Sequence, residues 1–143
     1  SKPTLYLSKY FKQNRIQYYE GLLNISEKAD YIGWINFFLN GIIKTSNEAI
    51  SLAREIKKLR EDDIYKIQSL GRSAKNGYSL FNKLFERPVV SVEDVCKIVN
   101  LKFPNAQNLI NKFIENDILF LYNQKQRNRS YVYKKYLDIL QKE

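Results

Sequence analysis

The sequence predicts a mainly α-helical protein, in which a helical bundle is followed by a unit of three helices and a small β-hairpin. In the first half, apolar residues recur at steps of three and four, which places them on one face of a helix. In the second half, short apolar runs, a proline and β-branched pairs replace that spacing. The 143 residues suffice for one modest domain or two small helical ones.

The first half contains four expected helices. Residues 5–11 have helical spacing, and Asn14 resembles an N-cap for a second helix over residues 15–25. Asp30 can cap a third helix, and a long amphipathic helix is expected over residues 46–70. The residues expected to be buried on the second helix are Ile16, Tyr19, Leu22 and Leu23.

The third expected helix has the broadest apolar face in the chain. Its members at helical spacing are Trp34, Phe37, Phe38, Ile42 and Ile43. We expect Trp34, Phe37 and Phe38 to form an interface, either with a second copy of the chain or with another domain.

A polar segment between Gly71 and Gly77 is typical of a hinge. The chain is therefore expected to divide into a helical segment, residues 1–71, and a second domain, residues 72–143. Ser91 with Asp94 can cap a helix, and Pro104 is in the first-turn position that proline favours. The elements expected after the hinge are helix 78–85, extended segment 88–91, helix 92–99, turn 100–103, helix 105–116, strand 118–122, loop 123–130, strand 131–133 and helix 135–140.

This order of elements is that of a winged helix-turn-helix. The outer face of helix 105–116 would carry Asn105, Asn108, Asn111 and Lys112, followed by Glu115. Asparagine amides can bond adenine edges in the major groove, and a lysine can bind a phosphate. The loop 123–130 would be the wing, and its basic residues are Lys125, Arg127 and Arg129.

The charge distribution supports an anionic partner for the second half. Residues 1–65 contain 10 Lys and Arg against 8 Asp and Glu, whereas residues 66–143 contain 14 against 7. The formal charge of +9 therefore resides mostly in the C-terminal part, and duplex DNA is the expected partner. The alternative is a protein interaction or dimerisation module that binds no nucleic acid, because winged helices also dock on proteins.

The composition excludes several kinds of chemistry. The chain has no His and a single cysteine, Cys96, so it cannot contain a Ser-His-Asp or Cys-His nucleophile, a His/Cys zinc cluster or an intrachain disulfide. We expect no metal and no cofactor. The chain also lacks an apolar run of membrane-spanning length and a signal peptide, so a cytoplasmic protein without a membrane partner is expected.

Several short strings resemble one group of bacterial proteins. They are Leu-Tyr-Leu-Ser-Lys-Tyr-Phe at residues 5–11, Asn-Arg at 14–15, Tyr-Tyr-Glu-Gly-Leu-Leu at 18–23, Trp-Ile-Asn-Phe-Phe-Leu at 34–39, Leu-Phe-Glu-Arg-Pro at 84–88, Arg-Asn-Arg at 127–129, Tyr-Val-Tyr at 131–133 and Tyr-Leu-Asp-Ile-Leu at 136–140. Their order and spacing are similar to the region after the catalytic loop of the larger bacterial Fic proteins and to the winged-helix extension that follows it.

The resemblance implies an accessory role. Fic proteins transfer AMP to hydroxyl side chains of target proteins, using a His-Pro-Phe-x-x-Gly-Asn-Gly-Arg loop in which the His is the general base. This sequence has no His and no such loop, so no catalytic residue of the family has a counterpart here and the chain itself is not expected to be an enzyme. The resemblance implies a C-terminal fragment that regulates or targets an N-terminal Fic-like catalytic domain, which would be its partner.

Overall fold

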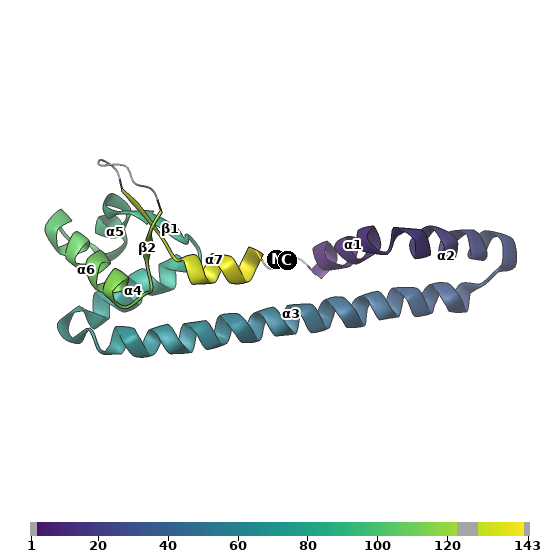
Figure 1. Cartoon of the computed structure of the whole chain (residues 1–143), viewed down its shortest axis with the longest axis horizontal. Coiled ribbons are helices and arrows are strands. Elements are labelled where there is room, and N and C mark those ends of the chain that lie inside the picture. Colours follow the sequence, from purple (N-terminus) through teal and green to yellow (C-terminus); the bar gives the residue numbers. More distant parts are fainter. Residues whose placement is uncertain (1–2, 123–128, 142–143) are drawn as a thin grey trace. The chain divides into compact units, whose positions relative to one another are not determined.

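The computed structural model describes residues 3–122 and 129–141, which are mainly helical and include a small three-stranded antiparallel sheet (Figure 1). In chain order the elements are α1 (Pro3–Gln13), α2 (Arg15–Lys28), α3 (Tyr31–Gln68), the 3-10 helix η1 (Gly71–Ser73), α4 (Ala74–Leu84), β1 (Val89–Ser91), α5 (Val92–Val99), α6 (Phe103–Glu115), β2 (Phe120–Leu121), β3 (Ser130–Val132) and α7 (Lys134–Gln141).

The chain forms two compact units that divide between Ala53 and Arg54, inside α3. The boundary expected after residue 71 is therefore not where the structure divides, because the end of α3 belongs to the C-terminal unit. The hinge expected at residues 72–76 is helical instead and comprises most of η1 and the start of α4.

Aromatic packing holds the N-terminal unit together, where α1 and α2 lie along the first part of α3 (Figure 1). The Phe11 and Phe37 rings stack with their centroids 5.8 Å apart, and Tyr18 meets Trp34 edge-on at 5.4 Å. Gly41 is buried beneath Tyr10, and a Cβ at this position would lie only 2.7 Å from the Tyr10 ring. Glycine is therefore needed at residue 41 for α1 to approach α3.

Two sequence expectations for the N-terminal unit are wrong. Residues 31–68 form one continuous helix rather than two, because no proline or glycine lies between residues 43 and 46 to end the first helix. The buried Thr45 hydroxyl donates to the Gly41 carbonyl (2.8 Å) within this helix. Asn14 does not cap α2, since its side-chain amide donates back to the Tyr10 carbonyl (2.8 Å).

The burial expected for α2 is also wrong. Four side chains that were expected to be buried are exposed by 40% to 75%, namely Ile16, Tyr19, Leu22 and Leu23. Helical spacing predicts that they share a face, but nothing in the described part of the chain covers that face.

The C-terminal unit is built on a sheet with the strand order β1-β3-β2, in which both pairings are antiparallel. Tyr131 in the central strand lies opposite Val90 on one side and Leu121 on the other. Side chains from the end of α3, from α4 to α6 and from the strands fill one core. Its fully buried members include Ile67, Leu80, Phe81, Leu84, Val90, Val95, Ala106, Ile110, Phe113, Ile118, Leu119 and Tyr133.

Local sequence signals set the start of α5 at the expected residue, whereas α6 begins at Phe103, two residues before the expected start at residue 105. The Ser91 hydroxyl accepts from the Asp94 backbone N–H (3.1 Å), and the Asp94 carboxylate accepts from the Ser91 N–H (2.9 Å), which completes a capping box. Pro104 lies in the first turn of α6, where its missing N–H costs nothing.

A buried carboxylate joins α3 to the sheet. Asp63 is 0% exposed, and its carboxylate accepts from the Tyr133 hydroxyl (2.7 Å) and from the Lys66 ammonium (2.6 Å). Burial raises the pKa of Tyr133, and the hydrogen bond to Asp63 raises it further, so this hydroxyl remains a proton donor.

Asp63→Ala should lower the free energy of unfolding by about 3 kcal/mol, because it leaves the Tyr133 hydroxyl buried without an acceptor. Tyr133→Phe should cost about 2 kcal/mol, and the double variant should cost less than the sum of the two. Urea unfolding followed by circular dichroism measures all three values. Strict additivity would show that the hydrogen bond contributes nothing to stability.

The capping box predicts a pH-dependent contribution from Asp94. Burial acts to raise the pKa of this carboxyl, but the hydrogen bonds from Ser91 and the charges of Arg87 and Lys97 outweigh it and hold the pKa below the usual 3.8. A lowered folded-state pKa stabilises the protein above the unfolded-state pKa, and this contribution is lost as the pH falls through the folded-state value. Asp94→Ala should therefore cost about 1 kcal/mol at neutral pH, and the cost should shrink below about pH 4.

The matched control for Asp94 is Glu93→Ala, which removes an exposed acid from the same helical turn. Thermal unfolding of both variants across the acid range makes the comparison. A cost of Asp94→Ala that stays constant into strong acid would refute the assignment.

Candidate nucleic-acid interface

Helix α6 is anchored by one face and exposes the other. Its buried face packs into the core through Ala106, Leu109, Ile110 and Phe113. Because side chains three and four residues apart share a helix face, the opposite face of α6 points outward. The exposed positions include Asn105, Asn108 and Asn111, as the sequence predicts, and Glu115 in the last turn.

Lys112 belongs to a tether rather than to the open face. It is half-buried, and its ammonium donates to the Ser73 hydroxyl at 2.7 Å. This bond joins α6 to η1. One N–H donor of the Lys112 ammonium, which was predicted to bind a phosphate, is therefore used within the unit. Sequence spacing placed Lys112 near the outer face but could not reveal its partner, which is 39 residues away.

A second tether joins α6 to the central strand. The Gln107 side-chain NH2 group donates to the side-chain oxygen Oδ1 of Asn111 (3.0 Å) and to the Tyr131 hydroxyl (3.3 Å). The Asn111 oxygen thus has a partner, which leaves its NH2 group for other contacts. Gln107 is not among the site residues predicted from the sequence, although a Gln and an Asn four residues apart on a helix are a recognisable pair.

The predicted wing is described only in part. Arg129 is exposed and directly precedes β3, whereas Lys125 and Arg127 lie outside the described residues. Beyond the wing, the Tyr122 N–H donates to the Ser130 carbonyl (2.8 Å), which extends the pairing of the two hairpin strands.

A hollow beside α6 is lined in part by residues of the expected hinge. The residues that line it come from η1, α4, the turn before α6, and α6 itself, and are Arg72, Ser73, Asn76, Leu101, Asn105, Asn108 and Leu109. Arg72 is exposed, and within the described ranges no carboxylate pairs with it. Arg72 therefore lines the same hollow as two of the predicted asparagines.

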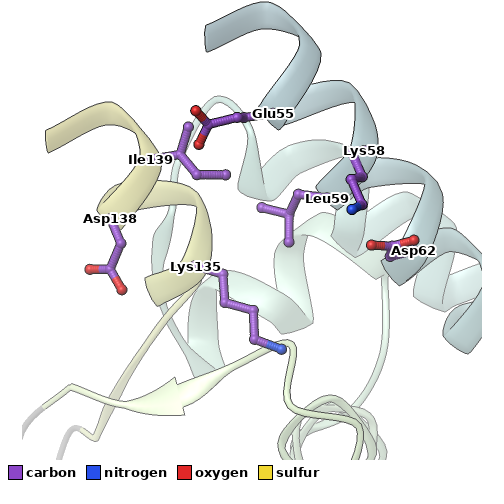
Figure 2. A pocket seen from close by; sticks show the side chains of 7 residues that line it. All are labelled: Glu55, Lys58, Leu59, Asp62, Lys135, Asp138 and Ile139. Carbon is purple, nitrogen blue, oxygen red and sulfur yellow. The ribbon is translucent and has the colours of Figure 1, made fainter. Parts of the chain in front are cut away.

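A different hollow lies between the end of α3 and α7, and Figure 2 shows its lining. Leu59 and Ile139 point into it, and the carboxylates of Glu55, Asp62 and Asp138 lie apart from one another. Among the described residues, no cluster of three metal-ligating side chains occurs anywhere.

The predicted interface residues are only partly accessible. Trp34 and Phe37 are half-buried among the aromatic rings of the N-terminal unit, and Phe38 is 37% exposed. The exposed apolar side chains of α3 lie at neighbouring positions instead. They form a stripe, here called the α3 stripe, of Ile32, Ile35, Leu39 and Ile43, each exposed by 49% to 75%.

Comparison with known families gives no assignment. No protein-family model matches this sequence. Within the described part of the chain, no helix is both long and apolar enough to cross a membrane.

Proposed function

We propose that the C-terminal unit is a winged helix-turn-helix that binds duplex DNA with the outer face of α6 and the hairpin. The observation that carries the proposal is the exposed row Asn105, Asn108 and Asn111 on a helix whose opposite face is locked into the core. An α-helix about 10–12 Å wide fits the major groove, where asparagine amides can bond adenine.

The topology supports the winged-helix part of the proposal. Helices α5 and α6 are joined by three residues, and the strand order β1-β3-β2 places the hairpin next to the strand that precedes α5. The turn between the helices is made by Asn100, whose φ of 51° is a left-handed conformation that asparagine tolerates well.

We propose further that the chain is an accessory part of a Fic-like protein and regulates or targets its AMP-transfer domain. The support is the series of strings quoted above, together with the exposed apolar side chains of the N-terminal unit, which another domain would cover. In this proposal the chain has no AMP-transfer activity of its own, because it lacks the histidine base.

The DNA proposal predicts weak, salt-sensitive binding to duplex DNA, because few phosphates can be neutralised. Anisotropy of a labelled duplex titrated with the chain at two ionic strengths measures it. Changing Lys125, Arg127 and Arg129 together to Ala should weaken binding and flatten the salt dependence. Absence of binding at low salt, or indifference to the triple change, would refute DNA binding.

The second candidate function is a protein interaction or dimerisation module, and the α3 stripe favours it. Four large aliphatic side chains on successive turns of one helix form an apolar face of a kind that usually marks an interaction surface.

If this second function holds, the chain should self-associate, and Ile35→Asp with Ile43→Asp should return it to a monomer in sedimentation velocity. Both residues are exposed, so the changes should leave the fold intact. Asn40→Asp adds charge at an exposed position on the same helix and is the control. A wild-type chain that sediments as a monomer at all concentrations counts against self-association through this face.

A further inference from the structure

We infer that Arg72 is a second phosphate-anchoring residue, which holds one DNA strand at the edge of α6 opposite the hairpin. The inference rests on the proposed DNA binding and deepens it. Two anchors on opposite edges of a helix match the two backbones that flank a major groove, so the ligand they fit is a duplex rather than a single strand.

Arg72 lies at the hollow beside α6. It lines the same hollow as Asn105 and Asn108, so a strand held by its guanidinium would run beside the amide row. From this position Arg72 would reach one of the two phosphate backbones that flank the groove floor read by α6.

The Arg72 guanidinium is available to bind a phosphate, unlike those of two other arginines in the unit. Arg87 in the same unit pairs with Asp94 at 2.9 Å, and Arg60 donates to the Asn82 side chain at 3.1 Å. No such partner occurs for Arg72 among the residues that the structure describes. Its planar fork of N–H donors is therefore open to a bidentate bond with a phosphate.

The backbone at Arg72 is held in place on both sides. Gly71 has a φ of +58°, which glycine adopts without strain, and it turns the chain directly before Arg72. On the other side of Arg72, the Ser73 hydroxyl accepts the hydrogen bond from Lys112 of α6. Arg72 thus sits between a fixed turn and a tether to the helix that would enter the groove.

The opposite edge of α6 has the same construction. The Gln107 tether ties α6 to Tyr131, and the exposed Arg129 lies two residues before that tyrosine. The asparagine row therefore lies on a helix that is tethered to η1 near Arg72 and to β3 near Arg129.

Arg72→Ala should weaken binding of the full chain to a labelled duplex about tenfold and reduce the slope of log affinity against log salt by about 1. The loss should be the same for A·T-rich and G·C-rich duplexes, since a phosphate contact carries no base information. Asn108→Ala should instead reduce the preference for A·T pairs. Arg72→Lys should recover part of the affinity, because lysine keeps the charge but not the fork.

The matched control is Arg54→Ala, an exposed arginine of the same unit that lies about 20 Å along α3 from the end of that helix. Circular dichroism should show the wild-type fold for both variants. If Arg72→Ala binds with the wild-type slope while the triple wing variant is impaired, the Arg72 inference is overturned and DNA binding stands. If the wild-type chain fails to bind duplex, or prefers single strands, both the inference and its basis fail.

Discussion

The hydrogen bond from Tyr133 to the buried Asp63 carboxylate is the constraint on which the C-terminal unit depends. A carboxylate without solvent is costly unless it is fully paired, and here the two donors are Tyr133 and Lys66. Tyr133 follows β3 directly, and its ring packs edge-on against Phe81 and Phe85 of the α4 region. The bond therefore sets the position of the central strand relative to α3. Tyr131, two residues before Tyr133, accepts a hydrogen bond from Gln107 of α6. The Tyr133–Asp63 bond therefore also influences the orientation of α6.

Those parts of the fold that local interactions specify could be predicted from the sequence. The limits of α5 follow from a capping box that Ser91 and Asp94 complete within four residues, and the start of α6 follows from Pro104 within about two residues. The continuity of α3 was harder to predict, because Ser46 is of a residue type that also starts helices. Thr45 is buried, and its hydroxyl donates to the Gly41 carbonyl within the helix. Burial depends on partners that are distant in the sequence.

The candidate site, too, was predictable only where residues close in the sequence decide its geometry. Helical spacing suffices to place the three asparagines on the outer face of α6. It could not show that Lys112 donates to Ser73, or that Arg72 lines the same hollow as Asn105 and Asn108, because these residues are about 30 to 40 positions apart in the sequence. The glycines around residues 72–76 suggested a hinge, yet Gly71 makes a fixed turn and Gly77 is buried against Ile67. A polar segment between glycines is thus equally compatible with a rigid, positioned edge.

The two proposed functions would use different surfaces on the two units. The C-terminal unit has the basic excess and the amide row, whereas the exposed large aliphatic side chains of α2 and the α3 stripe belong to the N-terminal unit. Contact with phosphates weakens as salt rises, because counterion release then gains less free energy. Burial of aliphatic surface is insensitive to simple screening and is strengthened by sulfate or phosphate salts. An accessory module of the proposed kind can therefore hold a protein partner through one unit under conditions in which the other unit releases DNA.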